Sequence, residues 1–572
     1  MASRFWVGGS GTWDNSSTAN WSATTGGASG ASAPTNADTV TFDANCGTAA
    51  TVTVASTAVS LNTTVNKADI NLSLSGNATL CTAAGTLTFT TGTITLNNNT
   101  LTMGLLSSAN ANTRAISFGT GSINLTGNGG GVINFNTATG FTYTGTPTVN
   151  LTYSGSTGTR SLFFGSSGGS QTNALSINVT AGSDIVQNTA VFHVNNFNFT
   201  GFTGTYTNTN NLLIYGNLTF VSGMTLSASA SGWNMSSVSG TQLITTNTKT
   251  LDFPITFNAT NGTFRLQDNM TVGSTRLTSI TTGTLDLNGN TLSTGRFDAS
   301  NSNVRVIAFG SGNITTTGSG TVWNIGTVTN FSYTGTPTVN ISNNSATATT
   351  VTTGAMSAAQ ALNFNYTVGT YTLTDTSAVY KSLNFTGFTG TIPNSVRTIY
   401  GSLTLVSGMT LTAGANATTF AATSGTNTIT TAAKTLNFPL TFNGVGGTFA
   451  FQDALTQGST RAFTITNGTV QLKAGATSTV GSFVASSTAV KYLQSTTPSS
   501  QATISQASGT VSVSDLTIQD SNAAGGASWN AYTDFENTDA GNNDGWNFSL
   551  SPPYASYEPP IIIRSFTQPR RF

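Results

Sequence analysis

The stretch "GTLTFTTGTITLNNNTLTMG", residues 85–104, decides the fold class. It contains the short segments 87–89, 94–96 and 101–103, each of which alternates apolar residues with Thr. Alternation with a period of two places the apolar side chains on one face and Thr on the other, as in a half-buried strand. Gly, Asn and Thr separate the segments, and these turns are too short to hold a helix. The stretch therefore predicts a succession of short strands.

The composition of the whole chain points the same way. Only 6% of the 572 residues are charged, against about 25% in a typical globular protein. Polarity comes instead from Thr, Ser, Asn and 62 Gly residues, which disfavour helices and suit strands and turns. Disorder is not expected, because 37% of residues are hydrophobic and the net charge is zero. Zero net charge also gives no electrostatic basis for a nucleic-acid partner.

Internal repeats extend over most of the chain. The repeated phrases are "FTYTGTPTVN" (141–150) with "FSYTGTPTVN" (331–340), "FNFTGFTG" (197–204) with "LNFTGFTG" (383–390), and "TTGTITLNNNTLTMG" (90–104) with "TTGTLDLNGNTLSTG" (281–295). The offsets indicate about two and a half copies of a module of roughly 190 residues. A recurring phrase of this kind indicates duplication of a structural unit.

These patterns predict an all-β fold, a repetitive β-solenoid resembling a parallel β-helix, with non-repeating end caps. An array of β-sandwich domains is the alternative. A solenoid accounts for the scarcity of charge, because stacked rungs align like residues, and like charges side by side are destabilising, whereas Thr and Asn stack without that cost. The expected organisation is an N-terminal Trp/Gly-rich cap (1–50), a partial first repeat (51–140), two repeat modules (141–330 and 331–510), a C-terminal β cap (511–549) and a Pro-rich extended tail (550–572).

Few residues are candidates for catalysis. His193 is the only histidine and lies within the apolar pattern "AVFHVNNFNF", so we expect a structural role. The densest carboxylate group is in "TDFENTDAGNND", which contains Asp534, Glu536, Asp539 and Asp544. It lacks the ligand spacing of an EF-hand, and a solvated turn is expected in place of a calcium or hydrolytic site. We therefore predict no catalytic residues, no metal ligands and no cofactor.

Two further sets of polar residues concern structure. "QDNMTVGSTR" (267–276) and "QDALTQGSTR" (452–461) share an Asp and an Arg, whereas Asn77 and Gly85 stand at the corresponding places in the partial first copy. Joint presence and joint loss predict a salt bridge between neighbouring rungs, formed within Asp268/Arg276 and within Asp453/Arg461. The sequence leaves open whether Cys46 and Cys81 pair.

The two ends resemble those of a family of bacteriophage virion proteins, the tail fibres and other appendages. The N-terminal match is "RFWVGGSGTWDNSSTANWSATTGGASGASAPTNADTVTFD", in which an aromatic-Trp-Val-Gly-Gly opening leads through Trp13 and Trp21 to a Pro-x-x-x-Asp strand start at Pro34. The end "LTIQDSNAAGGASWNAYTDFENTDAGNNDGWNF" is similar to the closing module of many such proteins. Related Trp-rich openings also occur in bacterial autotransporter-like surface repeats.

The resemblance implies a non-enzymatic structural protein that attaches a virion to a host surface. It implies a homo-oligomer, with a trimer expected, that contacts other virion proteins and a host glycan or protein. A bacterial surface adhesin or surface-layer-like protein is the alternative. No signal peptide or membrane span is visible, so we expect synthesis in the host cytoplasm and location in the virion, with the bacterial cell surface as the alternative. "IIIRSF" (561–566) in the tail predicts a short strand able to dock onto another protein.

Overall fold

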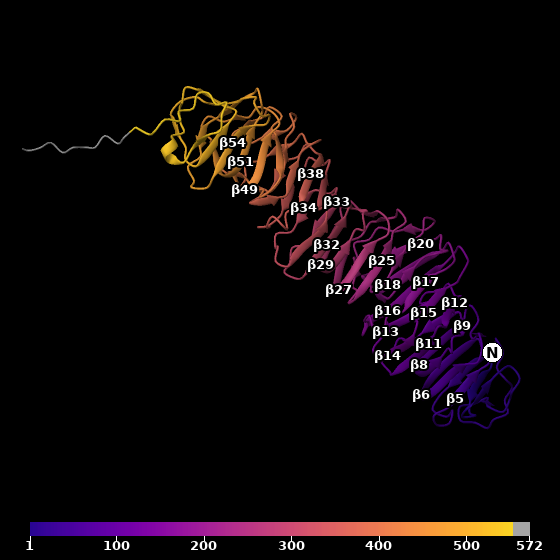
Figure 1. Cartoon of the computed structure of the whole chain (residues 1–572). Coiled ribbons are helices and arrows are strands. Elements are labelled where there is room, and N and C mark those ends of the chain that lie inside the picture. The colour runs from indigo at the N-terminus through magenta and orange to yellow at the C-terminus, as the bar shows by residue number, and fades with distance from the viewer. Residues whose placement is uncertain (553–572) are drawn as a thin grey trace, which may run out of the picture. The chain divides into compact units, whose positions relative to one another are not determined.

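The computed structural model describes residues 1–552. It is 50% strand and 1% helix and forms a β-solenoid of about 23 turns (Figure 1). The predicted all-β solenoid is confirmed, and parallel ladders replace the sandwich array considered as the alternative. The chain divides into two compact units, Met1–Thr412 and Ala413–Phe572, and each is described by itself.

In the first unit, one ladder of parallel strands supplies a strand to each successive rung. Its strands are β4 (Thr39–Phe42), β6 (Asn62–Leu74), β8 (Thr86–Thr95), β10 (Leu105–Ser107), β13 (Ile133–Thr137), β16 (Thr159–Ser167), β18 (Ile185–Val194), β21 (Leu212–Ile214), β24 (Trp233–Met235), β27 (Ile255–Leu266), β29 (Leu277–Asp286), β31 (Arg296–Asp298), β34 (Gly320–Asn324) and β37 (Thr349–Thr352).

A second ladder occupies the next side of the rungs. Its strands are β2 (Gly11–Trp13), β5 (Thr51–Val54), β6, β8, β11 (Arg114–Gly119) and β14 (Phe141–Gly145) and, after an interruption, β25 (Gly240–Thr245), β27, β29, β32 (Arg305–Gly310) and β35 (Phe331–Gly335). Across the interruption a separate ladder of β16, β18, β20 (Thr205–Asn208) and β23 (Thr225–Leu226) lies just before the first ladder in each rung, since residues 185–188 of β18 pair with β20 and residues 192–194 pair with β21. The longest strands, such as β8 and β29, belong to both ladders because they continue around a corner of the rung.

A third ladder completes the rungs. Its first part is β7 (Ala78–Thr79), β9 (Thr100–Met103), β12 (Ser122–Leu125), β15 (Thr148–Leu151), β17 (Ser176–Val179), β19 (Phe197–Asn198), β22 (Leu218–Thr219) and β25. Its second part is β26 (Thr250–Leu251), β28 (Met270–Val272), β30 (Thr291–Thr294), β33 (Asn313–Thr316), β36 (Thr338–Ser342), β38 (Asn363–Val368), β41 (Ser382–Asn384) and β44 (Leu403–Thr404). Shorter strands of the same unit are β39 (Leu373–Thr374), β40 (Ala378–Tyr380), β42 (Thr391–Ile392), β43 (Arg397–Ile399) and β45 (Thr410–Leu411).

The second unit repeats this plan. One ladder contains β46 (Thr418–Phe420), β49 (Leu440–Phe451), β51 (Ala462–Leu472) and β53 (Ser482–Val484). Another contains β47 (Thr426–Thr430), β49, β51, β54 (Lys491–Ser495), β57 (Leu516–Gln519) and β60 (Thr538–Asp539). The third contains β48 (Thr435–Leu436), β50 (Thr456–Gln457), β52 (Thr477–Val480), β55 (Ala502–Gln506) and β58 (Ser521–Gly525). The remaining elements are β56 (Thr510–Ser512), β59 (Ser528–Asn530) and the 3₁₀ helix η1 (Thr533–Phe535).

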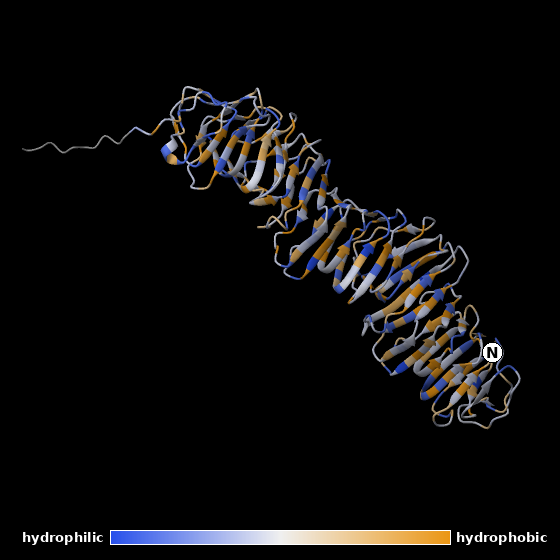
Figure 2. Cartoon of the chain, viewed as in Figure 1, coloured by the Kyte–Doolittle hydropathy of each residue, from blue (hydrophilic) through white to orange (hydrophobic). Residues whose placement is uncertain are grey.

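The alternating pattern sets which side chains enter the core. Leu87, Phe89 and Ile94 are at most 1% exposed, whereas Thr88 between them is half-buried on the outer face. Figure 2 shows the same alternation of hydrophobic and hydrophilic residues along the strands. Aromatic rings then stack between rungs, as in Phe297–Trp323 with ring centroids 4.6 Å apart. Full burial of each such side chain contributes about 1.5–3 kcal/mol.

Glycine allows the long strands to turn the corner. Gly92, Gly283 and Gly468 stand at equivalent places with φ of 105°, 88° and 84°. A Cβ atom at Gly283 would lie 1.9 Å from the carbonyl oxygen of Ala259 in the preceding rung. Only glycine fits there, because it has no Cβ and tolerates positive φ.

The repeated phrase "FTYTGTPTVN" forms a strand, a turn and a second strand. β14 ends at Gly145, which has φ of 82°, and β15 starts at Thr148. β35 (Phe331–Gly335) and β36 (Thr338–Ser342) reproduce the arrangement in the next copy. The phrase is therefore part of two ladders.

At the N-terminal end the Trp-rich segment closes the solenoid. β1 (Ser3–Trp6) pairs antiparallel with β3 (Trp21–Ser22) and parallel with β4. The rings of Trp6 and Trp21 meet edge to face at 5.0 Å and are fully buried. Asp38, at the end of the Pro-x-x-x-Asp motif, accepts the backbone N–H of Ala2 at 2.8 Å. The Pro-x-x-x-Asp motif thus has a structural role at this end of the chain.

Candidate functional site

The acidic segment near the C-terminal end contains the 3₁₀ helix η1, the short strand β60 and a β-bridge at Asp544. Asp534 accepts the backbone N–H of Ser551 at 3.0 Å, Asp539 accepts that of Gly541 at 2.9 Å, and Asp544 accepts the side-chain amide of Gln501 at 3.0 Å. Glu536 follows η1 in the left-handed region. Within residues 1–552, no group of three or more His, Cys, Asp or Glu side chains is placed to hold a metal ion.

His193 lies in β18, where its Nδ1 and the hydroxyl of Tyr215 are hydrogen-bonded at 2.8 Å. Burial lowers the pKa of His193 and raises that of Tyr215 to about 12. Both groups are therefore neutral at pH 7. Their ring centroids are 5.9 Å apart, so the pair joins two successive rungs of the same ladder.

The predicted pairing of Asp268 with Arg276 is wrong. Asp268 accepts the backbone N–H groups of Thr246 and Asn247, whereas Arg276 forms its salt bridge with Asp252 at 2.7 Å. The partners are 21–24 residues apart, which is one rung, whereas Asp268 and Arg276 are closer along the chain. In a parallel solenoid a side chain meets the rung above or below it.

The second copy confirms this correction. Asp453 accepts the backbone N–H groups of Thr431 and Ala432, and Arg461 donates to the Asn437 amide oxygen at 3.0 Å. Asn437 stands where the preceding copy has Asp252. In the partial first copy, Asn77 accepts the backbone N–H of Thr100 as Asn269 accepts that of Thr291, so Asn77 corresponds to Asn269 and not to Asp268.

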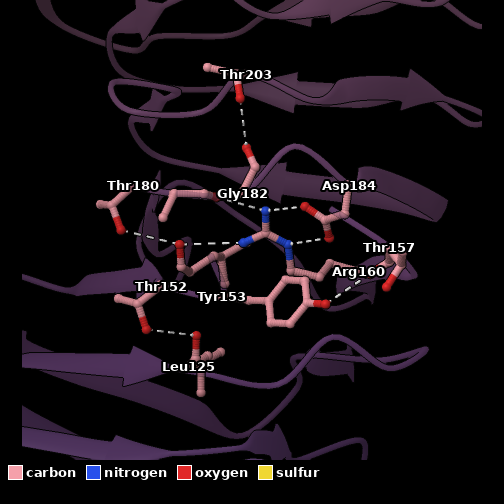
Figure 3. A network of polar contacts seen from close by, with 11 residues as sticks. Leu125, Thr152, Tyr153, Thr157, Arg160, Thr180, Gly182, Asp184 and Thr203 are labelled. Atoms are coloured by element: carbon pink, nitrogen blue, oxygen red, sulfur yellow. Dashed lines mark hydrogen bonds and ion pairs between the residues drawn. The ribbon is translucent and has the colours of Figure 1, made fainter. Parts of the chain in front are cut away.

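The most buried ion pair is Arg160 with Asp184 (Figure 3). Both side chains are 0% exposed, and the guanidinium donates to both carboxylate oxygens at 2.9 and 2.7 Å. It also donates to the carbonyl of Ala181 at 2.9 Å. The rings of Tyr153 and Phe202 lie 5.7 and 5.5 Å from it. This network is closed to solvent and joins one rung to the next.

A second buried pair, Arg397 with Asp375, has a similar role. Nε and one terminal nitrogen of Arg397 donate to the two oxygens of Asp375, each at 2.7 Å. The hydroxyls of Tyr380 and Ser395 also donate to this carboxylate, at 2.8 and 2.7 Å. Burial opposes the charged form of Arg397, but Asp375 raises its pKa above the ordinary value. Four donors therefore satisfy one buried carboxylate.

A set of buried cations that the sequence reasoning missed recurs in all copies. Arg114, Arg305 and Lys491 occupy equivalent places at the start of β11, β32 and β54 and are at most 1% exposed. Their donors meet backbone carbonyls of corner loops, for example Thr137 and Thr139 for Arg114, at 2.7 and 2.9 Å. Burial lowers the pKa of Arg114 to about 10. These cations fasten the corner loops to the rungs.

The signal for this set was present in the repeats. "TRAISFG" (113–119) and "VRVIAFG" (304–310) place an Arg two residues before the Ile of a matched phrase. "VKYLQS" (490–495) continues the pattern with Lys. The matched positions of Arg114, Arg305 and Lys491 in the copies are therefore visible in the sequence alone.

Asparagine ladders line the outer face of the third side. Asn150 donates to the side-chain oxygen of Asn124 at 2.8 Å, and Asn178 donates to that of Asn150 at 2.9 Å. The next copy repeats the ladder with Asn340 and Asn365. The expectation that Asn stacks between rungs is confirmed. The middle amides, Asn150 and Asn340, each use a donor and an acceptor in these bonds, and an Asn side chain has further donor and acceptor capacity for other partners.

The cysteines are both free thiols. Cys46 and Cys81 are at most 2% exposed. Burial raises the pKa of both, that of Cys46 to about 11. The question that the sequence left open, whether they pair, is answered in the negative.

No family of known proteins, no curated protein and no solved structure matches this chain. No helix within residues 1–552 is long and apolar enough to cross a membrane. The candidate functional surface of this chain consists of the Thr and Asn side chains that point outward from the strands. We call these side chains the Thr and Asn ranks.

Proposed function

We propose that this chain is a non-enzymatic structural protein of a bacteriophage virion, a tail fibre or other appendage that takes part in attachment to the host surface. The observation that carries the proposal is the use of its polar side chains. The buried ions join rungs or hold loops, and the outer faces repeat the same neutral donors and acceptors. A β-solenoid with such faces is suited to multivalent contact and to mechanical support.

The absence of catalysis belongs to the same proposal. A glycosidase needs two carboxylates about 5–9 Å apart on either side of a bond, with one of them able to donate a proton. Asp534, Asp539 and Asp544 each accept hydrogen bonds from their own turns or a neighbouring rung. Hydrogen bonding to Ser551 lowers the pKa of Asp534, which makes it a poor general acid.

The proposed partners follow from the surface chemistry. Hydroxyl and amide groups of the Thr and Asn ranks can donate to and accept from sugar hydroxyls or a protein backbone on a host cell. Since these groups recur on successive rungs, as in Asn124, Asn150 and Asn178, weak single contacts would add through multivalency. We further propose a homo-oligomer, a trimer, joined to other virion proteins. The tail segment predicted to dock onto such a protein, 561–566, lies outside the described residues.

Immunogold labelling of purified virions tests this assignment. Antibodies against the purified chain should label particles at one fixed structure, and pre-absorption with the chain should remove the label. Particles without label would refute it. Label on washed bacterial cells carrying no phage would favour the alternative, a surface adhesin or surface-layer-like protein.

A further inference from the structure

The second unit exposes large apolar side chains along one corner of its rungs. In the described part of this unit these are Val445, Val490, Tyr492, Phe535 and Leu550, which are 69%, 62%, 38%, 47% and 72% exposed. Val445, Val490 and Tyr492 line a shallow groove of about 400 Å³ whose remaining lining residues are uncharged. We call this surface the corner groove.

The groove is specific to this copy of the module. Tyr492 follows the buried Lys491, and in register it lies between Thr469 and Thr517 on neighbouring strands. At the equivalent places of the earlier copies, after Arg114 and Arg305, the chain has Ala115 and Val306. The neighbours of Tyr492 in register are both Thr, so its exposed ring and the two exposed valines form an apolar patch on a polar face, a feature typical of interaction surfaces.

We propose that the C-terminal segment 553–572 of the same chain covers the corner groove, with the apolar triplet 561–563 placed in it.

The position of the last described residues carries the first part of the argument. Backbone hydrogen bonds run from Lys491 to the carbonyl of Asp515 at 3.0 Å and from Asp515 to the carbonyl of Phe535 at 2.9 Å. Ser551 is bonded to the carboxylate of Asp534, beside Phe535. The described chain thus ends about two rungs from Val490, or about 10 Å at the usual strand spacing.

The length of the remaining chain fits this distance. Residues 553–560 precede the triplet, and an extended chain of that length reaches roughly 27 Å. The triplet can therefore reach both ends of the groove, and the short connection keeps it at millimolar effective concentration or above.

Charge gives an independent reason to choose this occupant. Residues 492–552 contain Asp515, Asp520, Asp534, Glu536, Asp539 and Asp544. They contain no Lys or Arg. The segment 553–572 carries Arg564, Arg570 and Arg571 against the single Glu558. An apolar triplet followed by basic residues is complementary to an apolar groove beside an acidic surface, and attraction of this kind fixes orientation.

Paired cysteines test the proposal directly. Val490→Cys with Ile562→Cys should form a disulfide within one chain on mild oxidation at low protein concentration, as seen by intact mass. Val304→Cys with Ile562→Cys is the matched control, because Val304 is 59% exposed and precedes the buried Arg305 as Val490 precedes Lys491. Equal yields from the two pairs, or a disulfide that joins two chains, would overturn the proposal; the second result would assign the groove to another copy.

Hydroxyl-radical footprinting gives a second readout without cysteines. In the Ile561→Asp/Ile563→Asp variant, modification of Tyr492 should rise at least two-fold, while modification of Tyr153 in the first unit stays unchanged. Loss of folding in the second unit would show as a rise in modification of Trp529 and Trp546, which are 4% and 9% exposed in the same unit. An unchanged rate at Tyr492 would refute docking of the triplet.

Discussion

Replacing Asp184 by Asn tests whether buried ion pairs hold the rungs together. The substitution keeps the shape of the side chain but removes its charge and turns an amide donor toward the guanidinium of Arg160. Because both side chains are 0% exposed, Arg160 would keep a charge without access to water. Removing one partner of such a pair costs about 3–5 kcal/mol. The lost carboxylate bonds at 2.9 and 2.7 Å account for part of this cost.

Hydrogen exchange measured by mass spectrometry is the suitable assay, because a solenoid of many rungs need not unfold in one step. Amides of β17, β18 and β20 should exchange roughly 100- to 4,000-fold faster in the variant, at tenfold per 1.4 kcal/mol. Asp286→Asn is the control, since its partner Arg265 is 44% exposed and the pair is expected to contribute less than about 1 kcal/mol. If Asp184→Asn changes exchange no more than Asp286→Asn, the reasoning fails.

Three further predictions concern other buried groups. Arg305→Met and Lys491→Met should each lower the local free energy of unfolding by about 1–3 kcal/mol, because carbonyls of the corner loops lose their donors. Hydrogen exchange of residues 299–306 and 487–491 should therefore become faster. Unchanged exchange at these residues would contradict the prediction. Stability should fall as pH rises from about 10 toward 12, because the buried phenols, Tyr215 with a pKa of about 12 among them, keep protons that the unfolded chain has already lost; thermal melts at pH 9 and 11 check the sign, and a higher midpoint at pH 11 would refute it. The folded chain should react with no thiol reagent at pH 8, and the two cysteines should both react in denaturant; fast labelling of the folded chain would contradict their burial.

Alternation and repeats were sufficient to predict the fold. The segment 87–89 lies in the first ladder, 94–96 lies in the second ladder or at its edge, and 101–103 lies in the third. Their apolar residues face the core, as a period of two predicts. The sequence also predicted the Asn ladders, because stacked rungs align like residues and Asn, unlike a charged residue, stacks without repulsion. These features are local or repeated, and both kinds of information are visible along one chain.

Side-chain partners were less predictable, for a geometric reason. Asp268 and Arg276 are neighbours in sequence and occur together, yet each bonds to the preceding rung, at Thr246 and at Asp252. A rung varies in length as its loops vary, so the residue above a given side chain cannot be counted from sequence alone. Arg160 and Asp184, which lie where the second ladder is interrupted, depend on such loops in particular.

The acidic residues near the C-terminal end show that residues close in sequence need not form one site. Asp534, Asp539 and Asp544 are close in sequence, a pattern that is also typical of metal sites and catalytic clusters. Asp534 lies in η1, Asp539 in β60 and Asp544 in a β-bridge with Asn522, and each accepts a different donor. The residue types within one segment therefore predict the contacts of its side chains less well than the register of the rungs does.

Competition for adsorption tests the central claim, that the outer faces of this chain contact the host. Host cells would be incubated with the purified full-length chain, and the rate of phage adsorption would then be measured against cells treated with the heat-unfolded chain. The account predicts slower adsorption in proportion to the folded chain added, with no glycan fragments released from the cells. Adsorption at the control rate, with the folded chain in excess, would contradict it.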